Sequence, residues 1–510
     1  MSVMRSLGAD GPRGAGRVRA AGPRRAAASL GAALLVAGGL SICTLTPAQA
    51  AQGKAAAADD FNGDGYADLV IGAPGGTVSG KAQAGYVAVT YGSAKGLDPA
   101  DKELVSRSTS GVPGSAAAKQ RFGQSVSKGD LDGDGYSDLV IGSADGASGG
   151  VVLWGSASGL TGGTALPGFG TAPQAGDFDG DGKADLALFG AADVDGDDPV
   201  TQQAGLWKGP VSRAGKPAAR LDFLDKSQWW GYDSDGAACA TDDSCVSGPH
   251  SVAGPVTPKA VGDVNGDHRQ DIAVWEYEGD GMWANQVLLG GPTGFEEGGE
   301  VGALGSTGGD GAVGIGDVDG DGYGDVVIGS GTDTAKVTLA YGSAKGTASG
   351  RETTFDQTLP GFYGAQEKGD HVGSCVSVAD VTGDGRAEIA LGISGEDFSG
   401  LTDAGSVALL HGSASGVTAE GSQVMHQNTA GVPGVAEKGD KFGAACALLD
   451  VNGDGHRDLT VSSTAENASA GAVWSLNGTT TGLTTTGAKA FGPTDVKAPA
   501  DKAQFGTALR

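Results

Sequence analysis

The sequence predicts an all-β fold in which seven short-stranded sheets close into a β-propeller. Three observations lead to this prediction. An acidic nine-residue segment occurs seven times, each copy is followed by a short apolar run and later a Gly-rich turn, and no amphipathic helical period of useful length is present. The copies start between Asp60 and Asp450 with a mean period of about 65 residues. Because about four short strands fit in one period, each repeat is expected to form one blade.

The composition fits a globular, turn-rich and acidic chain. Its 510 residues include 95 Gly, 61 Asp or Glu and 34 Lys or Arg, for a formal net charge of -27. Glycine without a three-residue period argues against collagen, and 39% hydrophobic residues argue against wholesale disorder. Because so acidic a surface repels phosphate backbones and anionic lipids, we expect no nucleic-acid partner, and metal cations become the natural counter-charge.

Residues 1–50 are predicted to be a secretory signal peptide. Six arginines, from Arg5 to Arg25, precede an apolar stretch over about residues 26–45, and Ala48-Gln49-Ala50 forms a small-residue cleavage site. The alternative, a membrane anchor, is weaker because Gly and Ala dilute the apolar run. We therefore expect a secreted chain with no membrane span after cleavage, a propeller over residues 51–510 and a monomer. The export route, general secretory or twin-arginine, stays open.

The two ends of the repeat region predict how the ring closes. The first acidic segment begins at Asp60, and only an Ala-rich stretch precedes it where several other repeats carry a Phe-Gly strand. At the other end, Phe505 and Gly506 form a Phe-Gly pair that no acidic segment follows. We therefore expect residues 502–510 to supply the missing strand of the first blade.

The acidic segments are predicted to be calcium loops. Each follows the pattern Asp-x-(Asp/Asn/Thr)-Gly-Asp-x-x-x-(Asp/Glu), which offers oxygen ligands at positions 1, 3, 5 and 9 and a backbone carbonyl at position 7. Calcium takes roughly six to eight oxygens and tolerates irregular geometry. A helical calcium loop would carry an acid at position 12, where all seven repeats have an apolar residue. Asp, Asn and Gly are also common in plain turns, but seven copies with fixed spacing favour up to seven Ca²⁺ ions.

The predicted ligands are the residues at positions 1, 3, 5, 7 and 9 of the loops at 60–68, 130–138, 177–185, 263–271, 317–325, 380–388 and 450–458. They are Asp60, Asn62, Asp64, Tyr66, Asp68, Asp130, Asp132, Asp134, Tyr136, Asp138, Asp177, Asp179, Asp181, Lys183, Asp185, Asp263, Asn265, Asp267, Arg269, Asp271, Asp317, Asp319, Asp321, Tyr323, Asp325, Asp380, Thr382, Asp384, Arg386, Glu388, Asp450, Asn452, Asp454, His456 and Asp458. The loops at Asp130, Asp177 and Asp317 have four carboxylates each and are expected to bind most tightly. The loop at Asp380, with Thr382 and Glu388, and the loop at Asp263, with His268 in place of Gly, are expected to be weak or empty.

An atypical insert covers about residues 190–255 and contains the candidate ligand-binding aromatics Trp229, Trp230 and Tyr232. Exposed aromatic rings on a loop are what a sugar or protein ligand stacks on, although either tryptophan can instead pack between blades. Cys239 and Cys245 lie close together in the same polar loop and are predicted to form a disulfide that closes it.

The Phe-Gly pairs, the acidic loops and Gly72-Ala73-Pro74 together resemble the FG-GAP repeat of integrin α subunits and of secreted bacterial FG-GAP/VCBS-type proteins. The resemblance covers roughly residues 59–510 and implies a seven-bladed propeller with calcium in the hairpins between the first two strands of blades. It also places Cys375 and Cys446 in adjacent blades, where they form either a disulfide or two buried thiols. No integrin-like transmembrane helix is present, so the resemblance does not carry over a receptor function.

Two functions from different classes fit the sequence. The first is a non-catalytic, calcium-stabilised adhesion or recognition module for an extracellular protein or glycan. The alternative is a secreted hydrolase or lyase, acting on polysaccharide or phospholipid, built on a propeller. The six histidines are scattered and no nucleophile elbow precedes a helix, so the sequence assigns no catalytic residue.

Overall fold

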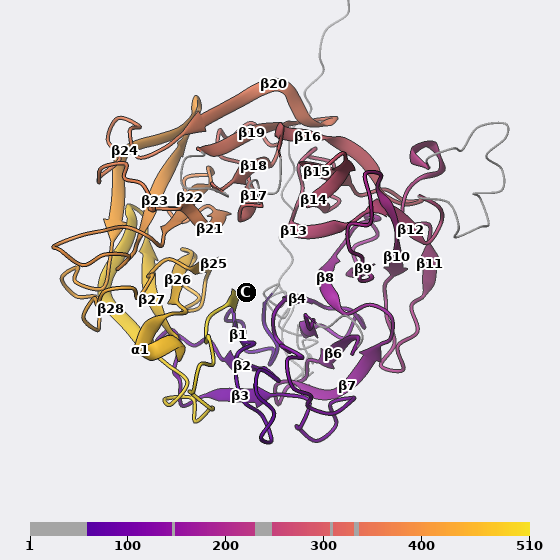
Figure 1. Cartoon of the computed structure of the whole chain (residues 1–510), viewed down its shortest axis with the longest axis horizontal. Coiled ribbons are helices and arrows are strands. Elements are labelled where there is room, and N and C mark those ends of the chain that lie inside the picture. Colours follow the sequence, from indigo (N-terminus) through magenta and orange to yellow (C-terminus); the bar gives the residue numbers. More distant parts are fainter. Residues whose placement is uncertain (1–58, 145–147, 230–246, 306–309, 331–335) are drawn as a thin grey trace, which may run out of the picture. The chain divides into compact units, whose positions relative to one another are not determined.

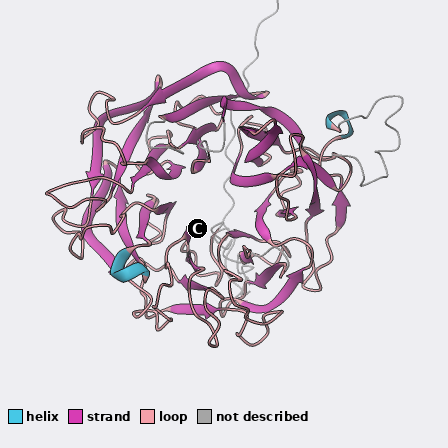
Figure 2. Ribbon diagram, in the orientation of Figure 1, coloured by secondary structure: helices cyan, strands magenta, loops and turns pink. Residues whose placement is uncertain are grey.

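The computed structural model describes residues 59–144, 148–229, 247–305, 310–330 and 336–510. The chain divides into two compact units, and the described residues all belong to the second, Gly53–Arg510. The segment predicted to be a signal peptide lies outside the described residues and stays a prediction. Within the second unit the described residues form seven antiparallel sheets and little helix (Figure 2).

Each sheet is one blade of a seven-bladed β-propeller, which confirms the predicted fold class (Figure 1). From inner to outer strand, the first blade contains β29 (Ala508–Leu509), β1 (Leu69–Ala73), β2 (Tyr86–Thr90) and β3 (Lys102–Val105). The second contains β4 (Val126–Gly129), β5 (Asp138–Ile141), β6 (Gly150–Trp154) and β7 (Thr161–Leu166). The third contains β8 (Thr171–Gly176), β9 (Asp185–Phe189) and β10 (Val200–Lys208), with β11 (Ala219–Leu221) and β12 (Ser251–Gly254) outside them.

The remaining four blades have four strands each. They are β13 (Val256–Gly262), β14 (Asp271–Gly279), β15 (Met282–Leu289) and β16 (Glu296–Gly305); β17 (Val313–Gly316), β18 (Asp325–Ile328), β19 (Val337–Ser343) and β20 (Gly346–Phe355); β21 (Val372–Ala379), β22 (Glu388–Ile393), β23 (Ser406–Ser413) and β24 (Gly416–Met425); and β25 (Ala445–Leu449), β26 (Asp458–Ser463), β27 (Ala472–Thr479) and β28 (Gly482–Phe491). Two short helices, η1 (Lys226–Gln228) and α1 (Glu466–Ser469), lie between strands.

The hydrophobic core consists of seven clusters, each between two adjacent blades. Because a blade packs against a neighbour on both faces, its second strand is buried on both faces and reads as a continuous apolar run, as in β1. In the cluster between the last and the first blade, Leu69 and Ile71 pack with Leu449 and Phe505. Sheet-on-sheet packing therefore holds the ring together at every seam.

The last strand, β29, closes the ring by pairing antiparallel with β1. Ile71 pairs with Leu509, Gly72 pairs with Ala508, and Val70 donates its N–H to the carbonyl of Arg510 at 2.8 Å. The predicted closure by the C-terminal strand is therefore confirmed.

The Phe-Gly pairs mark close contacts between blades. Gly123 has φ +84°, in the left-handed region, and its carbonyl oxygen lies against Gly72 of the preceding blade. A Cβ atom at Gly72 would meet that oxygen at 2.2 Å, and a Cβ at Gly392 would meet Gly443 O at 2.0 Å. Neither position in these seams has room for a side chain.

The insert of the third blade divides its outermost strand into two pieces. The C-terminal half of β10 pairs with β11, starting at Leu206 and Leu221. The N-terminal half pairs with β12, from Gln203 with Ser251 to Val200 with Gly254. The strands β10, β11 and β12 therefore all lie within the predicted atypical insert of about residues 190–255.

A disulfide joins the inner strands of the last two blades. It links Cys375 of β21 to Cys446 of β25, whose Cα atoms are 5.7 Å apart. Of the two states that the sequence left open for this pair, the structure contains the disulfide.

Candidate metal centres in the blade hairpins

Six of the seven acidic segments connect the first and second strands of a blade, as predicted, and the one at Asp60 leads directly into β1. Its first carboxylate organises the turn: Asp130 Oδ1 accepts hydrogen bonds from the N–H groups of Gly133 at 2.8 Å and Asp134 at 3.1 Å, and Oδ2 accepts one from Gly135 at 2.9 Å. The loops at Asp177, Asp317 and Asp380 repeat these bonds. Glycines at positions 4 and 6, with φ +78° and +91° at Gly133 and Gly135, allow so tight a turn.

The ninth residue ties each loop to the rest of its blade. Asp138 is fully buried; its Oδ2 accepts the N–H of Leu131 at 2.8 Å, and its Oδ1 accepts the N–H of Gly155, at the end of β6, at 2.8 Å. Burial raises the pKa of this carboxyl to about 7, although the two hydrogen bonds oppose the rise. A cation bound beside this carboxyl would favour its ionised form.

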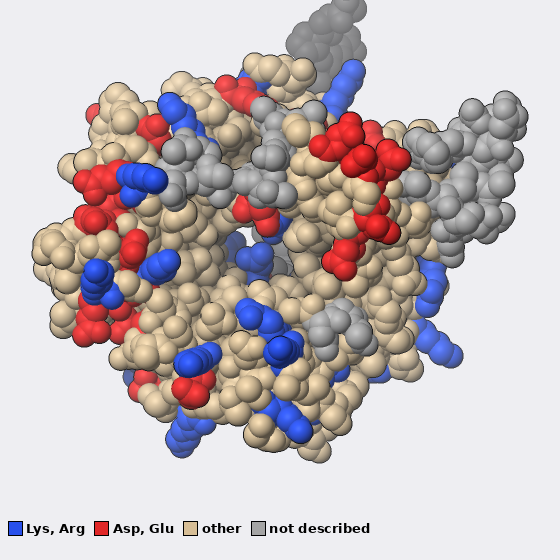
Figure 3. Space-filling view, viewed as in Figure 1, with Lys and Arg blue, Asp and Glu red and all other residues tan. Residues whose placement is uncertain are grey.

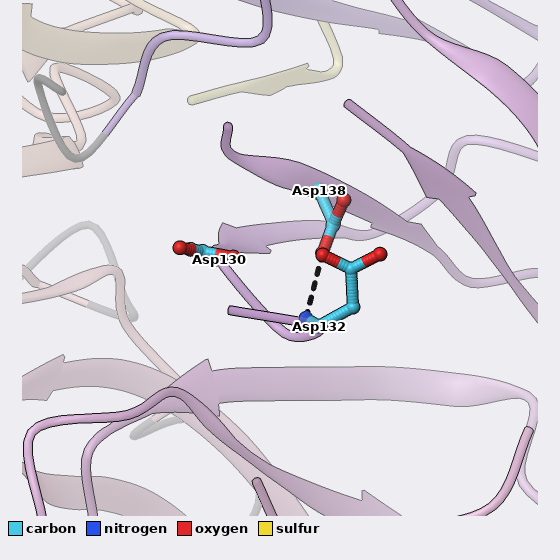
Figure 4. A group of neighbouring side chains, drawn as sticks. All are labelled: Asp130, Asp132 and Asp138. Atoms are coloured by element: carbon cyan, nitrogen blue, oxygen red, sulfur yellow. Dashed lines mark hydrogen bonds between the residues drawn. The ribbon is translucent and has the colours of Figure 1, made fainter. Parts of the chain in front are cut away.

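Three loops bring three carboxylates together. In each, one oxygen from positions 1, 3 and 9 lies within 4.8 Å of the others: Asp130, Asp132 and Asp138; Asp177, Asp179 and Asp185; and Asp317, Asp319 and Asp325. Figure 4 shows the first group, in which the N–H of Asp132 also donates to Asp138 at 3.3 Å. The fifth-position acids lie outside these groups, and each accepts the N–H of the predicted carbonyl ligand at position 7, as Asp134 does from Tyr136.

The other four loops carry Asn or Thr at position 3, and the described residues contain no such three-carboxylate group there. Asn62 Nδ2 instead donates to Asp64 at 3.1 Å, and Asn265 Nδ2 donates to Asp267 at 2.9 Å. The three loops with four carboxylates, which are expected to bind calcium most tightly, are thus the loops in which three carboxylates lie close together.

A basic side chain bridges positions 3 and 5 in each three-carboxylate loop. Arg213, from the turn between β10 and β11, contacts Asp132 at 2.6 Å and Asp134 at 2.7 Å. Lys208 pairs with Asp179 and, at 2.8 Å, with Asp181; Arg351 of β20 pairs with Asp319 at 3.0 Å and Asp321 at 3.6 Å. We call Arg213, Lys208 and Arg351 the bridging cations.

The sequence pattern did not single out the bridging cations. One signal was present. In each of these blades a glycine, which we call the capping glycine, donates its N–H to the ninth carboxylate of the loop, as Gly209 does to Asp185. Lys208 directly precedes this glycine in the third blade, where the second and fifth blades have Trp154 and Tyr341. Arg213 and Arg351 pack over those aromatic rings, at 5.8 Å from Trp154 and 4.6 Å from Tyr341. Aligning the repeats on the capping glycine would therefore have found Lys208.

The two loops expected to be weak have distinct local structures. In the loop at Asp380, Glu388 Oε2 accepts the N–H of Val381 at 2.8 Å, while its Oε1 lies 3.2 Å from His411 Nδ1. The bond to Glu388 raises the pKa of His411. In the loop at Asp263, His268 takes the position of Gly with φ +68°, and Arg269 pairs with Asp267.

Of the two roles that the sequence left open for Trp229, the structure shows packing between blades. Its side chain is 4% exposed, packs in the cluster between the third and fourth blades, and donates Nε1–H to the carbonyl of Leu224 at 2.7 Å. A ring held in this way cannot stack on a ligand. Trp230, Tyr232, Cys239 and Cys245 lie outside the described residues, and their predicted roles stay predictions.

The inner strands surround a central cavity of about 620 Å³. Its lining includes Lys128, Asp59 and Arg510, and Lys128 Nζ lies 3.0 Å from Asp59 Oδ1. The acids Asp130 and Asp177 of the acidic loops also line it. In the part of the chain that the structure describes, no helix is long and apolar enough to cross a membrane.

The fold and loops define a repeat propeller with acidic hairpins, and comparison with known proteins identifies the repeat. The FG-GAP repeat model matches residues 53–90, 372–410 and 442–476, and the FG-GAP-like repeat model matches residues 130–188. The chain therefore carries FG-GAP repeats, as the motifs predicted.

Curated relatives match over short segments. Phosphatidylinositol-glycan-specific phospholipase D of Rattus norvegicus is 38% identical over 106 residues, which is 21% of this chain and 12% of that protein. Integrin alpha-PS5 of Drosophila melanogaster is 35% identical over 103 residues, 20% of this chain and 9% of that protein. Among solved structures, AofleA from Arthrobotrys oligospora is 10% identical with a TM-score of 0.36, over 73% of this chain and 86% of that chain.

Proposed function

We propose that this protein is a secreted, calcium-binding propeller that recognises an extracellular protein or glycan without catalysing a reaction. The observation that carries the proposal is the grouping of three carboxylates in each of three equivalent hairpin loops. Hard oxygen donors held by a tight, glycine-containing turn suit Ca²⁺. The similarity of one segment to integrin alpha-PS5 supports a role in adhesion.

The loop carboxylates would hold calcium, and the ion would supply positive charge that neutralises them. The residues expected to do so at the three strongest sites are those at positions 1, 3 and 9, with the acid at position 5 and the carbonyl at position 7 completing the set. The buried ninth carboxylate connects the ion to the third strand of the blade through the capping glycine, as Asp138 does through Gly155. Calcium binding would therefore stiffen one rim of the ring, which is where a recognition surface needs rigidity.

The test is a screen of the full chain against glycans and surface proteins, with calcium and with a chelator. A D130N/D177N/D317N variant should lose the calcium-dependent part of both binding and thermal stability. A D193N/D195N/D198N variant removes the same charge from exposed acids outside the loops and should behave like the wild type. Melting that does not respond to calcium would contradict the metal sites.

The alternative function is tested in parallel. The segment shared with the phospholipase covers only 12% of that protein, so its activity is not carried over here. Turnover of polysaccharide or phospholipid by the purified chain, with no binding in the screen, would favour the hydrolase or lyase. Secretion is tested separately, by finding whether the exported protein begins at Ala51.

A further inference from the structure

The rim opposite the acidic loops carries the same polar set in two adjacent blades, in which the Gln and the Asp are buried and the Glu is half-buried. One set is Gln357, Asp370 and Glu396, around the sixth blade, and the other is Gln427, Asp440 and Glu466, around the seventh. Each residue lies 70 positions from its counterpart, so the two sets are structural repeats of each other. Figure 3 shows Asp and Glu side chains gathered over these blades, with Lys and Arg among them.

Each set contains a buried amide with an unused acceptor. Gln357 is 4% exposed and Gln427 is 2% exposed. Gln357 Nε2 donates to Glu396 Oε2 at 2.9 Å, and Gln427 Nε2 donates to Glu466 Oε2 at 2.8 Å. Within the described part of the chain, neither amide oxygen Oε1 accepts a hydrogen bond. A buried oxygen without a partner is costly, so the fold retains it for a reason.

The Glu carboxylate of each set contacts the amide, and the Asp of the same set is buried. Asp370 is 2% exposed and Asp440 is 4% exposed. The main-chain carbonyl of Asp370 accepts the N–H of Gly395 at 3.0 Å, and its carboxylate accepts the N–H of Glu367 at 2.6 Å. Burial, together with the charges of Asp370 and Glu367, raises the pKa of Glu396 to about 6, although the hydrogen bond from Gln357 opposes the rise. These pockets therefore concentrate oxygen atoms and negative charge away from bulk solvent.

The chain contains a third version of the pocket, at the second blade, in which it supplies its own cation. Arg107 stands where the other two have Gln, and Gln120 stands where they have Asp. Arg107 Nη1 donates to the carbonyl of Pro113 at 2.9 Å, and Nη2 donates to the carbonyls of Ser148 at 3.1 Å and Gly149 at 2.5 Å. Ala117 N–H donates to Gln120 Oε1, just as Glu437 N–H donates to Asp440 Oδ2, so the loops are equivalent. The two pockets that contain a buried Asp thus lack the arginine, and the pocket that contains the arginine lacks the Asp.

We propose that Gln357, Asp370 and Glu396, and likewise Gln427, Asp440 and Glu466, form two further divalent-cation sites that take Ca²⁺. The amide oxygen and the two carboxylates are hard donors, and an ion among them satisfies the unused acceptor and offsets the crowded charge together. Each ion would link the segment that connects two blades to the loop after the second strand of the following blade. In the first set, these are the segment between β20 and β21 and the loop between β22 and β23. These sites are separate from the hairpin loops and lie at the other end of the strands.

The test is a count of bound calcium in the full chain, by equilibrium dialysis and metal analysis. The E396Q/E466Q variant should bind one ion fewer for each changed pocket. The control variant E352Q/E420Q makes the same charge change on the outer strands β20 and β24 and should bind as many ions as the wild type. An unchanged count in E396Q/E466Q, above all with raised stability, would mean that a proton occupies these pockets, and would overturn the proposal.

A second pair of variants keeps the test valid if E396Q/E466Q does not fold. Q427R/D440Q copies the Arg107 pocket into the seventh blade. This variant should fold and bind one ion fewer, and calcium should raise its melting temperature less than that of the wild type. Q357L/Q427L keeps volume and charge but removes the amide oxygen, and it should weaken the same two sites. If both variants bind calcium as the wild type does, the proposal fails. The loop variant D130N/D177N/D317N loses different ions, so failure here leaves the proposed function untouched.

Discussion

Arg213 of the third blade donates from Nε to Asp132 Oδ2 of the second blade at 2.6 Å, across the seam between them. The same guanidinium reaches Asp134 and packs over Trp154. A cation thus lies between an aromatic ring and the acids of a metal loop. One of the three loops with four carboxylates therefore carries a permanent counter-charge, which would oppose the binding of a cation.

Replacing Arg213 with Ala should tighten calcium binding to this loop. Its side chain is 46% exposed, so the ion pair itself contributes below about 1 kcal/mol. Removing a positive charge beside the ion should raise calcium affinity roughly fivefold, and calcium should then raise the melting temperature more than in the wild type. Calorimetric titration of R213A measures the change. R220A is the matched control, because Arg220 packs over Trp207 and forms no ion pair with a loop acid in the described structure. Weaker binding in R213A would show that the guanidinium orients the ligands instead.

The features that the sequence predicted are those that repeat or that local spacing determines. Seven copies of the loop, the apolar run after each and the Phe-Gly pair at Phe505 were sufficient for the blades and for the closing strand. The sequence did not predict the bridging cations because each comes from a different position in its repeat. No periodic signal therefore marks Arg213 and Arg351. They are brought to the loops only by the packing of hairpins.

Burial of Trp229 also depends on contacts that are distant in sequence. Its neighbours in a polar, acidic stretch made it look exposed. The cluster that covers it includes Phe223 and Phe295, and Phe295 joins it only when the third and fourth blades pack together. Such tertiary packing is invisible to local composition.

Replacing His268 with Gly should stabilise the loop at Asp263. The backbone there has φ +68°, which costs roughly 1–2 kcal/mol for a residue with a Cβ atom and nothing for Gly. The ring itself is exposed, so little packing is lost. Denaturant unfolding in chelator should rank the variants H268G above H268N above wild type, because Asn tolerates this region better than His. A ranking in which wild type is most stable would indicate that His268 makes a favourable contact.

Removing residues 502–510 should abolish cooperative folding at moderate temperature. The deletion takes away β29 and leaves β1 as an unpaired inner edge, and it removes Phe505, which is fully buried between the last and first blades. The single change F505A should already cost about 3–5 kcal/mol. D501N, at an exposed residue just before the segment, is the control and should melt like the wild type. A truncated chain that melts near the wild-type temperature would contradict closure by this strand.

Glu276 of β14 should make stability fall as pH rises. Burial, together with the charges of Glu278 and Glu297, raises the pKa of its carboxyl from 4.5 to about 8. Because the folded state holds the proton more tightly than the unfolded state, the stabilisation is complete below about pH 4.5 and is lost as pH rises to about 8. The variant E276Q keeps the neutral form at every pH, so its advantage over wild type should grow across that interval. Melting in saturating calcium, with E296Q at an exposed residue of β16 as control, measures the difference. Parallel pH curves for E276Q and wild type would show that Glu276 titrates normally.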